Sequence, residues 1–337
     1  MLSFLDKQIK MDSEEDVELV VNKIDDCRNM KVLELRGNTI GIEAGKRIAQ
    51  ALEKHPELEK CLWSDLFTGR LKTEIPVILR TLCSALINAK CYITELDLSD
   101  NAFGPIGAEG ISQFLMSPSA YSLQVLKLNN NGLGAGGKTI ARCLLECHKN
   151  ALRDSSVFKL KTFIAGRNRL EDPGANALAE AFSVLGSLEE INVAQNGIRG
   201  KGICALARSF KSNPSLRVIN LNDNTCTAEG AIALSEALCG LTKLKILDLG
   251  DSLCRDEGII SISNATLDGN HKELEYMDFS GNELSAGAAK IVIKKWKELF
   301  VTTKQNLKLK MSSNCFGSQF QDVEDATENT FIDVGEE

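Results

Sequence analysis

Hydrophobic and polar positions follow one nine-residue pattern, L-x-x-L-x-L-x-x-N, along most of this 337-residue chain. Eight copies keep the final asparagine, and two copies have another residue in its place. The copies end at Asn38, Leu66, Asn101, Asn131, Asn168, Asn196, Asn224, Ser252, Asn282 and Asn314. Successive copies are separated by 28, 35, 30, 37, 28, 28, 28, 30 and 32 residues. Repetition at this spacing predicts a protein built from ten similar units.

Each copy predicts the same order of elements. The alternation in L-x-L predicts a short strand that buries every second side chain. The asparagine side chain has donors and acceptors, so it can satisfy backbone groups where the chain leaves the strand. Apolar residues then recur every three or four positions, as in residues 44–55 and 174–186, which predicts an amphipathic helix. This strand–helix unit is the leucine-rich repeat.

The length of the repeat predicts the shape of the fold. A spacing of 28 residues leaves room for a full helix beside each strand. Neighbouring strands stack about 4.8 Å apart, whereas packed helices need about 8–10 Å, and this difference forces curvature. The predicted fold is an α/β leucine-rich-repeat solenoid, a horseshoe with a parallel β-sheet on the concave side and α-helices on the convex side. It resembles the ribonuclease-inhibitor subtype of the repeat.

A solenoid needs caps, because a terminal repeat would otherwise expose its core. Residues 1–30 are predicted to form an N-terminal capping helix region, in which Ser13 and Asp16 are placed as a capping box. Residues 31–316 are predicted to be one leucine-rich-repeat domain of about ten repeats. Residues 317–337 are predicted to be an acidic, disordered C-terminal tail.

Charge is distributed unevenly along the chain. The formal net charge is −7, and residues 311–337 hold seven acidic and no basic side chains, so residues 1–310 are neutral. A nucleic-acid-binding surface requires a clustered excess of basic residues. No nucleic-acid partner is therefore expected.

The cysteines and the hydropathy predict the environment of the protein. Eleven cysteines without a C-x-x-C pair, and only three histidines, favour reduced, buried thiols over a disulfide framework or a metal centre. The N-terminus becomes charged too early for a signal peptide, and no apolar run approaches the ~20 residues that span a bilayer. We expect a cytoplasmic, monomeric protein without membrane insertion.

Two intervals, of 35 and 37 residues, are the longest, and the first carries unusual residues. Segment 62–76, LWSDLFTGRLKTEIP, follows a predicted strand and places Arg70 and Lys72 near Asp65. The extra residues of the second interval are placed around 147–159. The residue before each template asparagine, or before its substitute, forms a column along the same edge: Gly37, Asp65, Asp100, Asn130, Arg167, Gln195, Asp223, Asp251, Gly281 and Ser313. Cations beside carboxylates on loops held by a sheet predict a binding site from which Arg70 and Lys72 project.

Several of these segments resemble the signature of the Ran GTPase-activating proteins. The motif W-S-D-x-F-T-G-R-x-K-x-E-I-P occupies residues 63–76, and L-S-D-N-A-F-G-P occupies residues 98–105. N-N-G-L-G at 130–134 and G-R-N-R-L-E at 166–171 follow in matching order. Generic leucine-rich repeats share only the L-x-L-x-x-N part. The resemblance is therefore specific, and it extends over roughly residues 30–300.

The resemblance implies a GTPase-activating protein for the small GTPase Ran, which stimulates GTP hydrolysis in trans and maintains the Ran gradient of nucleocytoplasmic transport. Such a protein is not a stand-alone enzyme. Ran itself binds GTP and Mg, so this chain needs no cofactor or metal. The implied partners are Ran-GTP and a Ran-binding helper protein. The tail is shorter than in other members, and the C-terminal domain that docks vertebrate members at the nuclear pore is not seen. The expected location is cytoplasmic, with the cytoplasmic face of the nuclear envelope left open.

The resemblance also implies two catalytic candidates, Arg70 and Asn130. Asn130 would order the catalytic machinery of Ran, because an amide can donate and accept hydrogen bonds at once. Arg70 would anchor the interface rather than enter the nucleotide pocket as a finger. Asn131, a template residue, is expected to be structural, and Trp63 is expected to pack in the core.

Further residues are implied to bind the partner. Lys72 and Arg167 would contact Ran directly. Asp65 and Asp100 would either contact Ran or orient Arg70, and the sequence leaves both roles open.

Other functions remain as alternatives. A leucine-rich-repeat binding or inhibitor module without GTPase activation would share the architecture but would not explain the F-T-G-R-x-K insertion. A stand-alone enzyme is disfavoured, because the sequence has no Gly-rich phosphate loop and no nucleophile–base pair. A fragment of an innate sensor would normally accompany a nucleotidase domain, which the sequence lacks.

Overall fold

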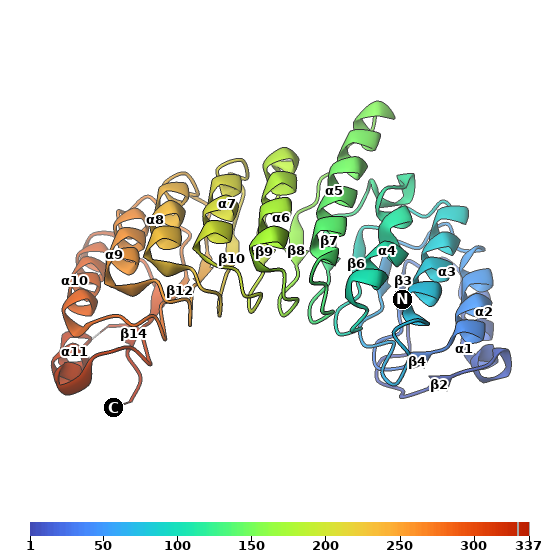
Figure 1. Ribbon diagram of the computed structural model, residues 1–337, viewed down its shortest axis with the longest axis horizontal. Helices are drawn as coiled ribbons and strands as arrows, with labels where there is room; N and C mark the ends of the chain where they lie inside the picture. Colours follow the sequence, from blue (N-terminus) through green and yellow to red (C-terminus); the bar gives the residue numbers. More distant parts are fainter. Residues whose placement is uncertain (329, 337) are drawn as a thin grey trace. The chain divides into compact units, whose positions relative to one another are not determined.

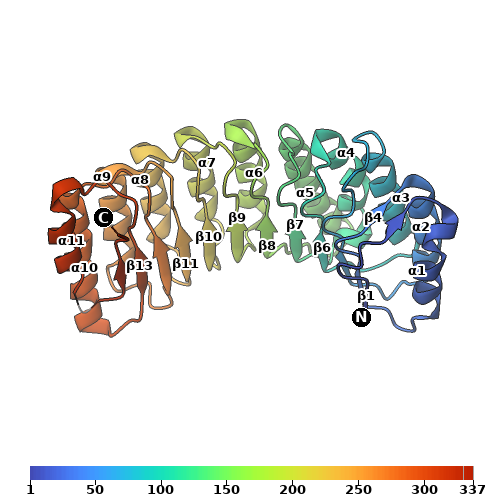
Figure 2. The same cartoon turned by 90° about the horizontal axis from the view of Figure 1, so that it is seen from below.

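The computed structural model describes residues 1–328 and 330–336, which fall into two compact units, Met1–Asn168 and Arg169–Glu337. In each unit, short parallel strands form one layer and helices form the other (Figure 1, Figure 2). The chain is therefore an α/β leucine-rich-repeat protein. Each of the ten predicted copies contains a strand.

The sheet of the N-terminal unit has parallel strands in the order β1-β3-β5-β6-β7-β8. These strands are β1 (Leu2–Ser3), β3 (Val32–Glu34), β5 (Lys60–Leu62), β6 (Glu95–Asp97), β7 (Val125–Lys127) and β8 (Thr162–Ile164). A separate parallel pair joins β2 (Lys10–Met11) to β4 (Thr39–Ile40). The central strand residues Leu33, Cys61, Leu96, Leu126 and Phe163 lie in register and are buried. The predicted alternation is thus confirmed.

The helices of this unit follow the strands in alternation. They are α1 (Glu14–Asp26), α2 (Ile42–Leu52), α3 (Ile75–Asn88), α4 (Gly104–Leu115) and α5 (Gly136–Arg153), with a 3₁₀ turn η1 (Pro118–Ala120). The predicted capping box of Ser13 and Asp16 begins α1. Helix α5 has 18 residues against 11 in α2, and Figure 1 shows it extending past α4. The second long interval therefore lengthens this helix and the loop that follows it.

Template asparagines satisfy backbone groups where the chain leaves the sheet, as predicted, and they also connect neighbouring repeats. The Oδ1 of Asn101 accepts the N–H of Leu66 at 2.7 Å, while its Nδ2 donates to the carbonyls of Trp63 and Leu98. The Oδ1 of Asn131 in turn accepts the N–H of Asn101 at 2.8 Å. Each amide thereby satisfies buried backbone groups of two adjacent turns. We call this series the asparagine ladder.

The C-terminal unit repeats the same plan. Its strands pair in the order β9 (Glu190–Asn192), β10 (Val218–Asn220), β11 (Ile246–Asp248), β12 (Tyr276–Asp278), β13 (Lys308–Lys310) and β14 (Ile332–Asp333). Its helices are α6 (Glu171–Leu185), α7 (Gly200–Phe210), α8 (Thr227–Leu238), α9 (Arg255–Thr266), α10 (Ala286–Thr303) and α11 (Phe320–Ala326), with a 3₁₀ turn η2 (Gly317–Gln319). Ser252 replaces a template asparagine, and its hydroxyl donates to the Gly250 carbonyl at 2.9 Å.

The C-terminal segment differs from the predicted disordered tail. Residues 317–328 and 330–336 include η2, α11 and β14, and β14 pairs with β13. Val323 is fully buried, and Ile332 and Val334 are less than a tenth exposed. These apolar side chains cover the end of the last repeat, which their acidic neighbours obscure in the sequence. Asn329 and Glu337 lie outside the described residues.

Asp248, in the sheet of the C-terminal unit, has a pKa raised above its ordinary value, first by burial and further by the carboxylate of Asp278 on the neighbouring strand. The Gly250 N–H, the Asn222 amide and the Lys310 ammonium oppose this shift. A carboxyl group whose pKa is higher in the folded state destabilises the fold at a pH above that pKa. This penalty disappears as the pH falls through the folded pKa.

Asp248→Asn is therefore expected to raise the free energy of unfolding at pH 7, because the amide keeps an acceptor for the Gly250 N–H without the buried charge. The gain should shrink as the pH falls toward the ordinary aspartate pKa. Urea unfolding at neutral and at acidic pH measures the gain in the free energy of unfolding and its dependence on pH. A gain that is the same at every pH would contradict the assigned cause.

Candidate functional site

The column before the template residues has one backbone conformation. All of its members have a positive φ, between 49° and 76°. Its members in the N-terminal unit are Gly37, Asp65, Asp100, Asn130 and Arg167, and those in the C-terminal unit are Gln195, Asp223, Asp251, Gly281 and Ser313. Glycine, asparagine and aspartate adopt this left-handed conformation most readily. We call this set the rim column, and it lies just beyond the carboxyl ends of the strands.

Arg167 has the same left-handed backbone as the other members of the rim column, but it carries a long cationic side chain. Its φ is 59°, a conformation that costs about 1–2 kcal/mol for a residue with a Cβ. Its side chain is exposed and makes no ion pair with residues 1–328 or 330–336. An exposed cation without an ion pair in these ranges, on a turn that the repeat fixes, is a candidate for contact with a partner.

Asn130 and Asn131 are adjacent but have opposite environments. Asn130 is exposed, and its Nδ2 donates to the Asp100 carboxylate at 3.0 Å. Asn131 is fully buried; its N–H donates to the Oδ1 of Asn168 and its Nδ2 to the Leu98 carbonyl. The structure thus brings Asp100 to Asn130, which it orients, and gives Asn131 the structural environment that the sequence predicts.

Arg70 does not project as predicted. Its side chain is only 11% exposed. Nη1 donates to the Asp12 carboxylate, Nη2 to the Met11 carbonyl at 3.2 Å, and Nε to the Thr39 hydroxyl at 2.9 Å. Hydrogen bonds from Lys10 and then from Arg70 lower the pKa of Asp12. The Arg70 guanidinium therefore packs against the N-terminal segment, because three hydrogen bonds to nearby acceptors are more favourable than its full hydration.

Asp65 is linked to Arg70 only indirectly. Its carboxylate accepts the Thr68 hydroxyl at 2.7 Å, and the Thr68 carbonyl accepts the Thr39 hydroxyl at 2.9 Å. Asp65, Thr39 and Thr68 also line a hollow of about 330 Å³. Asp65 therefore orders the loop that carries Arg70, whereas Asp12 is the direct counter-ion of Arg70. The sequence left open whether Asp100 contacts Ran or orients Arg70, and the structure brings the Asp100 carboxylate to the Asn130 amide.

The tip of the loop is its most exposed part. Leu71 is 67% exposed, and Lys72 is exposed without an ion pair to any residue of the described ranges. The indole of Trp63, by contrast, is fully buried, as predicted. Lys72 therefore remains a contact candidate and Trp63 does not.

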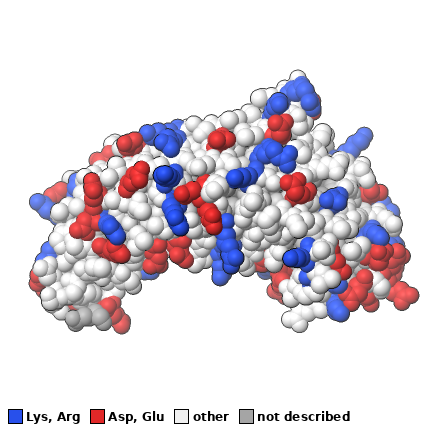
Figure 3. Space-filling model, viewed as in Figure 1, with Lys and Arg blue, Asp and Glu red and all other residues white. Residues whose placement is uncertain are grey.

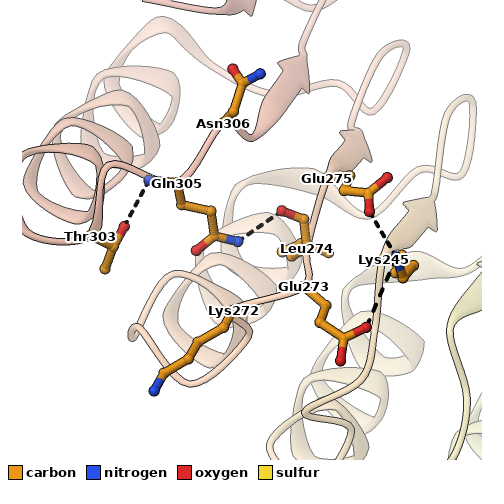
Figure 4. A pocket seen from close by; sticks show the side chains of 8 residues that line it. All are labelled: Lys245, Lys272, Glu273, Leu274, Glu275, Thr303, Gln305 and Asn306. Atoms are coloured by element: carbon orange, nitrogen blue, oxygen red, sulfur yellow. Dashed lines mark hydrogen bonds and ion pairs between the residues drawn. The ribbon is translucent and has the colours of Figure 1, made fainter.

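A larger hollow lies elsewhere and has its own internal partners. It measures about 530 Å³ and lies at the amino ends of β11, β12 and β13 in the C-terminal unit (Figure 4). Lys245 bonds Glu275 at 2.9 Å and lies 4.0 Å from Glu273, while Gln305 donates to the Leu274 carbonyl. The rim column lies at the opposite ends of the strands. This hollow is therefore not part of the candidate site.

Charges are mixed on the face drawn in Figure 3, with acidic side chains gathered near the N-terminus. There the first turn of α1 holds Glu14, Glu15 and Asp16.

Within residues 1–328 and 330–336, no group of three or more His, Cys, Asp or Glu could hold a metal ion. None of the helices in these ranges combines the length and the apolar composition needed to cross a bilayer.

Comparison with known proteins decides the family. A family model described as Leucine Rich repeat matches residues 26–49, 89–112 and 212–235. Ran GTPase-activating protein 2 from Caenorhabditis elegans is 58% identical over 340 residues, covering 100% of this chain and 35% of that protein. The chain belongs to the Ran GTPase-activating protein family.

Other members of the Ran GTPase-activating protein family match parts of the chain. Ran GTPase-activating protein 1 from Xenopus laevis is 52% identical over 58% of this chain and 34% of its own length. Ran GTPase-activating protein 1 from Saccharomyces cerevisiae is 32% identical over 57% of this chain and 47% of its own length. The chain spans about a third of the length of the first two relatives.

A solved internalin from Listeria monocytogenes has a TM-score of 0.41 at 13% identity, covering 94% of this chain and 89% of that one.

In this Ran GTPase-activating protein family member, the sequence did not reveal the partners of Arg70. Asp12 precedes it by 58 residues and belongs to no repeat. The one available signal is that Asp12 immediately precedes the capping box at Ser13, which predicts a fixed backbone there. A capping box indicates that the backbone near Asp12 is rigid, but it does not indicate that Asp12 binds Arg70.

Proposed function

We propose that this protein stimulates GTP hydrolysis by the small GTPase Ran, acting in trans. The observation that carries the proposal is the exposed amide of Asn130, fixed by Asp100 and by a backbone conformation that the adjacent buried Asn131 maintains. The names of the full-length relatives support it. In this proposal, Ran supplies GTP and Mg, and this chain supplies no cofactor.

A partner can accelerate a small GTPase in two ways. It can insert an arginine that neutralises charge on the phosphates, or it can order the glutamine of the GTPase that aligns the attacking water. Entry of Arg70 into a nucleotide pocket would require it to leave Asp12, Met11 and Thr39. The arrangement therefore favours the second way.

Asn130 has the chemistry for ordering a catalytic side chain. One N–H of its amide donates to Asp100, and the group also has a second N–H and a carbonyl oxygen. An exposed donor and acceptor on one fixed amide can hold a glutamine or a switch-loop hydroxyl of the partner. Because the Asn130 amide is already ordered in the free protein, its side chain loses little conformational entropy when the complex forms.

The remaining site residues bind the partner in this proposal. Lys72 and Arg167 are exposed cations for acidic groups of Ran, while Asp65 and Asp100 order the loop and the amide. A Ran-binding helper protein, a monomeric state, a cytoplasmic location and a role in the Ran gradient belong to the same proposal. No nucleic-acid partner is part of it.

A GTP-hydrolysis assay with a catalytic amount of this protein tests the proposal. With Ran-GTP in large molar excess, a trace of this protein should accelerate phosphate release by up to about 10⁵-fold over Ran alone. A protein that binds Ran-GTP without accelerating release would be an inhibitor-like module, which is the alternative. An unchanged rate together with measurable binding would therefore overturn the proposed function and retain the alternative.

A further inference from the structure

The segment that holds Arg70 is itself fixed on both sides. Before it, β2 pairs with β4, and the Gly41 N–H donates to the Met11 carbonyl at 2.7 Å. After it, the Ser13 capping box begins α1. Asp12 therefore lies between two anchored elements, and its carboxylate has a defined position.

Four residues form what we call the Arg70 clasp: Met11, Asp12, Thr39 and Arg70. Three different nitrogens of the guanidinium donate to three acceptors from two separate segments. The clasp is closely packed, since a Cβ at Gly41 would lie 3.1 Å from Nη1 of Arg70. A planar, always charged fork suits several fixed acceptors better than a lysine would.

The clasp fixes the middle of the inserted loop. The Arg70 N–H donates to the Phe67 carbonyl at 2.9 Å, and the Leu71 N–H donates to the Glu74 carboxylate at 3.1 Å. With Arg70 held inward, the two following residues, Leu71 and Lys72, are exposed. The direction in which the tip points therefore depends on the clasp, in which Asp12 is the charged acceptor.

We propose that Asp12 is a positioning residue of the GTPase-activating site and acts through Arg70 to fix residues 67–74 as a docking surface for the partner GTPase. This inference rests on the proposed function. Arg70 then contributes from inside the clasp, and Lys72 makes the outward contact. Loss of Asp12 should weaken binding of Ran-GTP more than it slows the chemical step, since Asn130 is untouched.

Asp12→Ala is expected to raise the KM for Ran-GTP about tenfold, the usual effect of losing a charge-assisted hydrogen bond, and to leave kcat within about twofold. The KM of Asp12→Asn should lie between those of the parent protein and Asp12→Ala, because the asparagine keeps an acceptor oxygen. Asp25→Ala is the matched control: it removes an N-terminal carboxylate that pairs with Lys54 at 2.9 Å, away from the clasp. It should leave both constants unchanged.

A double-mutant cycle shows whether Asp12 acts through Arg70. In an Arg70→Ala background, Asp12→Ala should have little further effect, because the clasp is already broken. If the two effects instead multiply, or if Asp12→Ala leaves KM unchanged, the positioning role is wrong.

Hydrogen exchange of the backbone amides in residues 67–74 gives a readout that does not require Ran. Asp12→Ala should accelerate exchange there and Asp25→Ala should not. Unchanged exchange in this loop would overturn the clasp. If the parent protein fails to stimulate Ran, the proposed function fails, while the exchange measurement still decides whether Asp12 holds the loop.

Discussion

Asn130→Ala is expected to reduce the stimulated rate of GTP hydrolysis by Ran about 100-fold, the usual cost of losing one preorganised hydrogen-bonding group. The loss should be in kcat, because the amide is proposed to act on the catalytic machinery of the partner. The free energy of unfolding should fall by only about 1 kcal/mol, because alanine adopts the left-handed backbone of residue 130 less readily than asparagine, while the exposed side chain bonds only Asp100. Single-turnover hydrolysis at saturating protein measures the rate.

Asn130→Asp is the informative companion variant. It has nearly the same shape but replaces the amide N–H with a carboxylate oxygen opposite Asp100. Like charges at this separation repel, so the side chain should turn away and the stimulation should be lost as well. Stimulation equal to that of the parent in Asn130→Ala would remove the water-ordering role.

Asn131→Ala should have the opposite effect and lower the free energy of unfolding by about 3 kcal/mol. The substitution leaves the buried N–H of Asn101 without its acceptor and empties the space of a fully buried amide. Below the unfolding transition, the remaining folded protein should still stimulate Ran. Urea unfolding, with hydrolysis measured on the same preparation, separates the two effects.

Asn282→Ala provides a matched control in the C-terminal unit. Asn282 is also fully buried, accepts the Cys254 N–H at 2.9 Å and donates to the Leu249 carbonyl at 2.7 Å. It should lose similar stability, although neither of its sequence neighbours is a proposed contact with Ran. If Asn131→Ala lost kcat while keeping its full stability, Asn131 would be functional and the division between the two neighbours would be wrong.

The strands and the asparagine ladder could be predicted because their causes are local and repeated. L-x-L alternation requires one buried face, and each template asparagine has the donors and acceptors that a turn leaving the sheet needs. Ten copies repeat the same requirement, so weak copies such as that ending at Ser252 are recognised from their neighbours. The same logic separated buried Asn131 from exposed Asn130.

Two features could not be predicted because they depend on contacts distant in sequence. The repeat pattern placed Arg70 on the correct loop but could not show that Asp12, 58 residues earlier, would hold it. Acidic composition predicted disorder at residues 317–337, yet the buried side chains of Val323, Ile332 and Val334 and the pairing of β14 with β13 order residues 317–328 and 330–336. A few apolar side chains against an existing core suffice, and composition averages over them.

The asparagine ladder also has a direction. Leu66 receives its acceptor from Asn101, Asn101 from Asn131, and Asn131 from Asn168, at sequence separations of 35, 30 and 37 residues. The acceptor thus always comes from later in the chain. During translation, each of these three N–H groups can gain its asparagine acceptor only after the ribosome has delivered the following repeat. Over this part of the growing polypeptide, the newest turn is therefore the one that still lacks its asparagine acceptor.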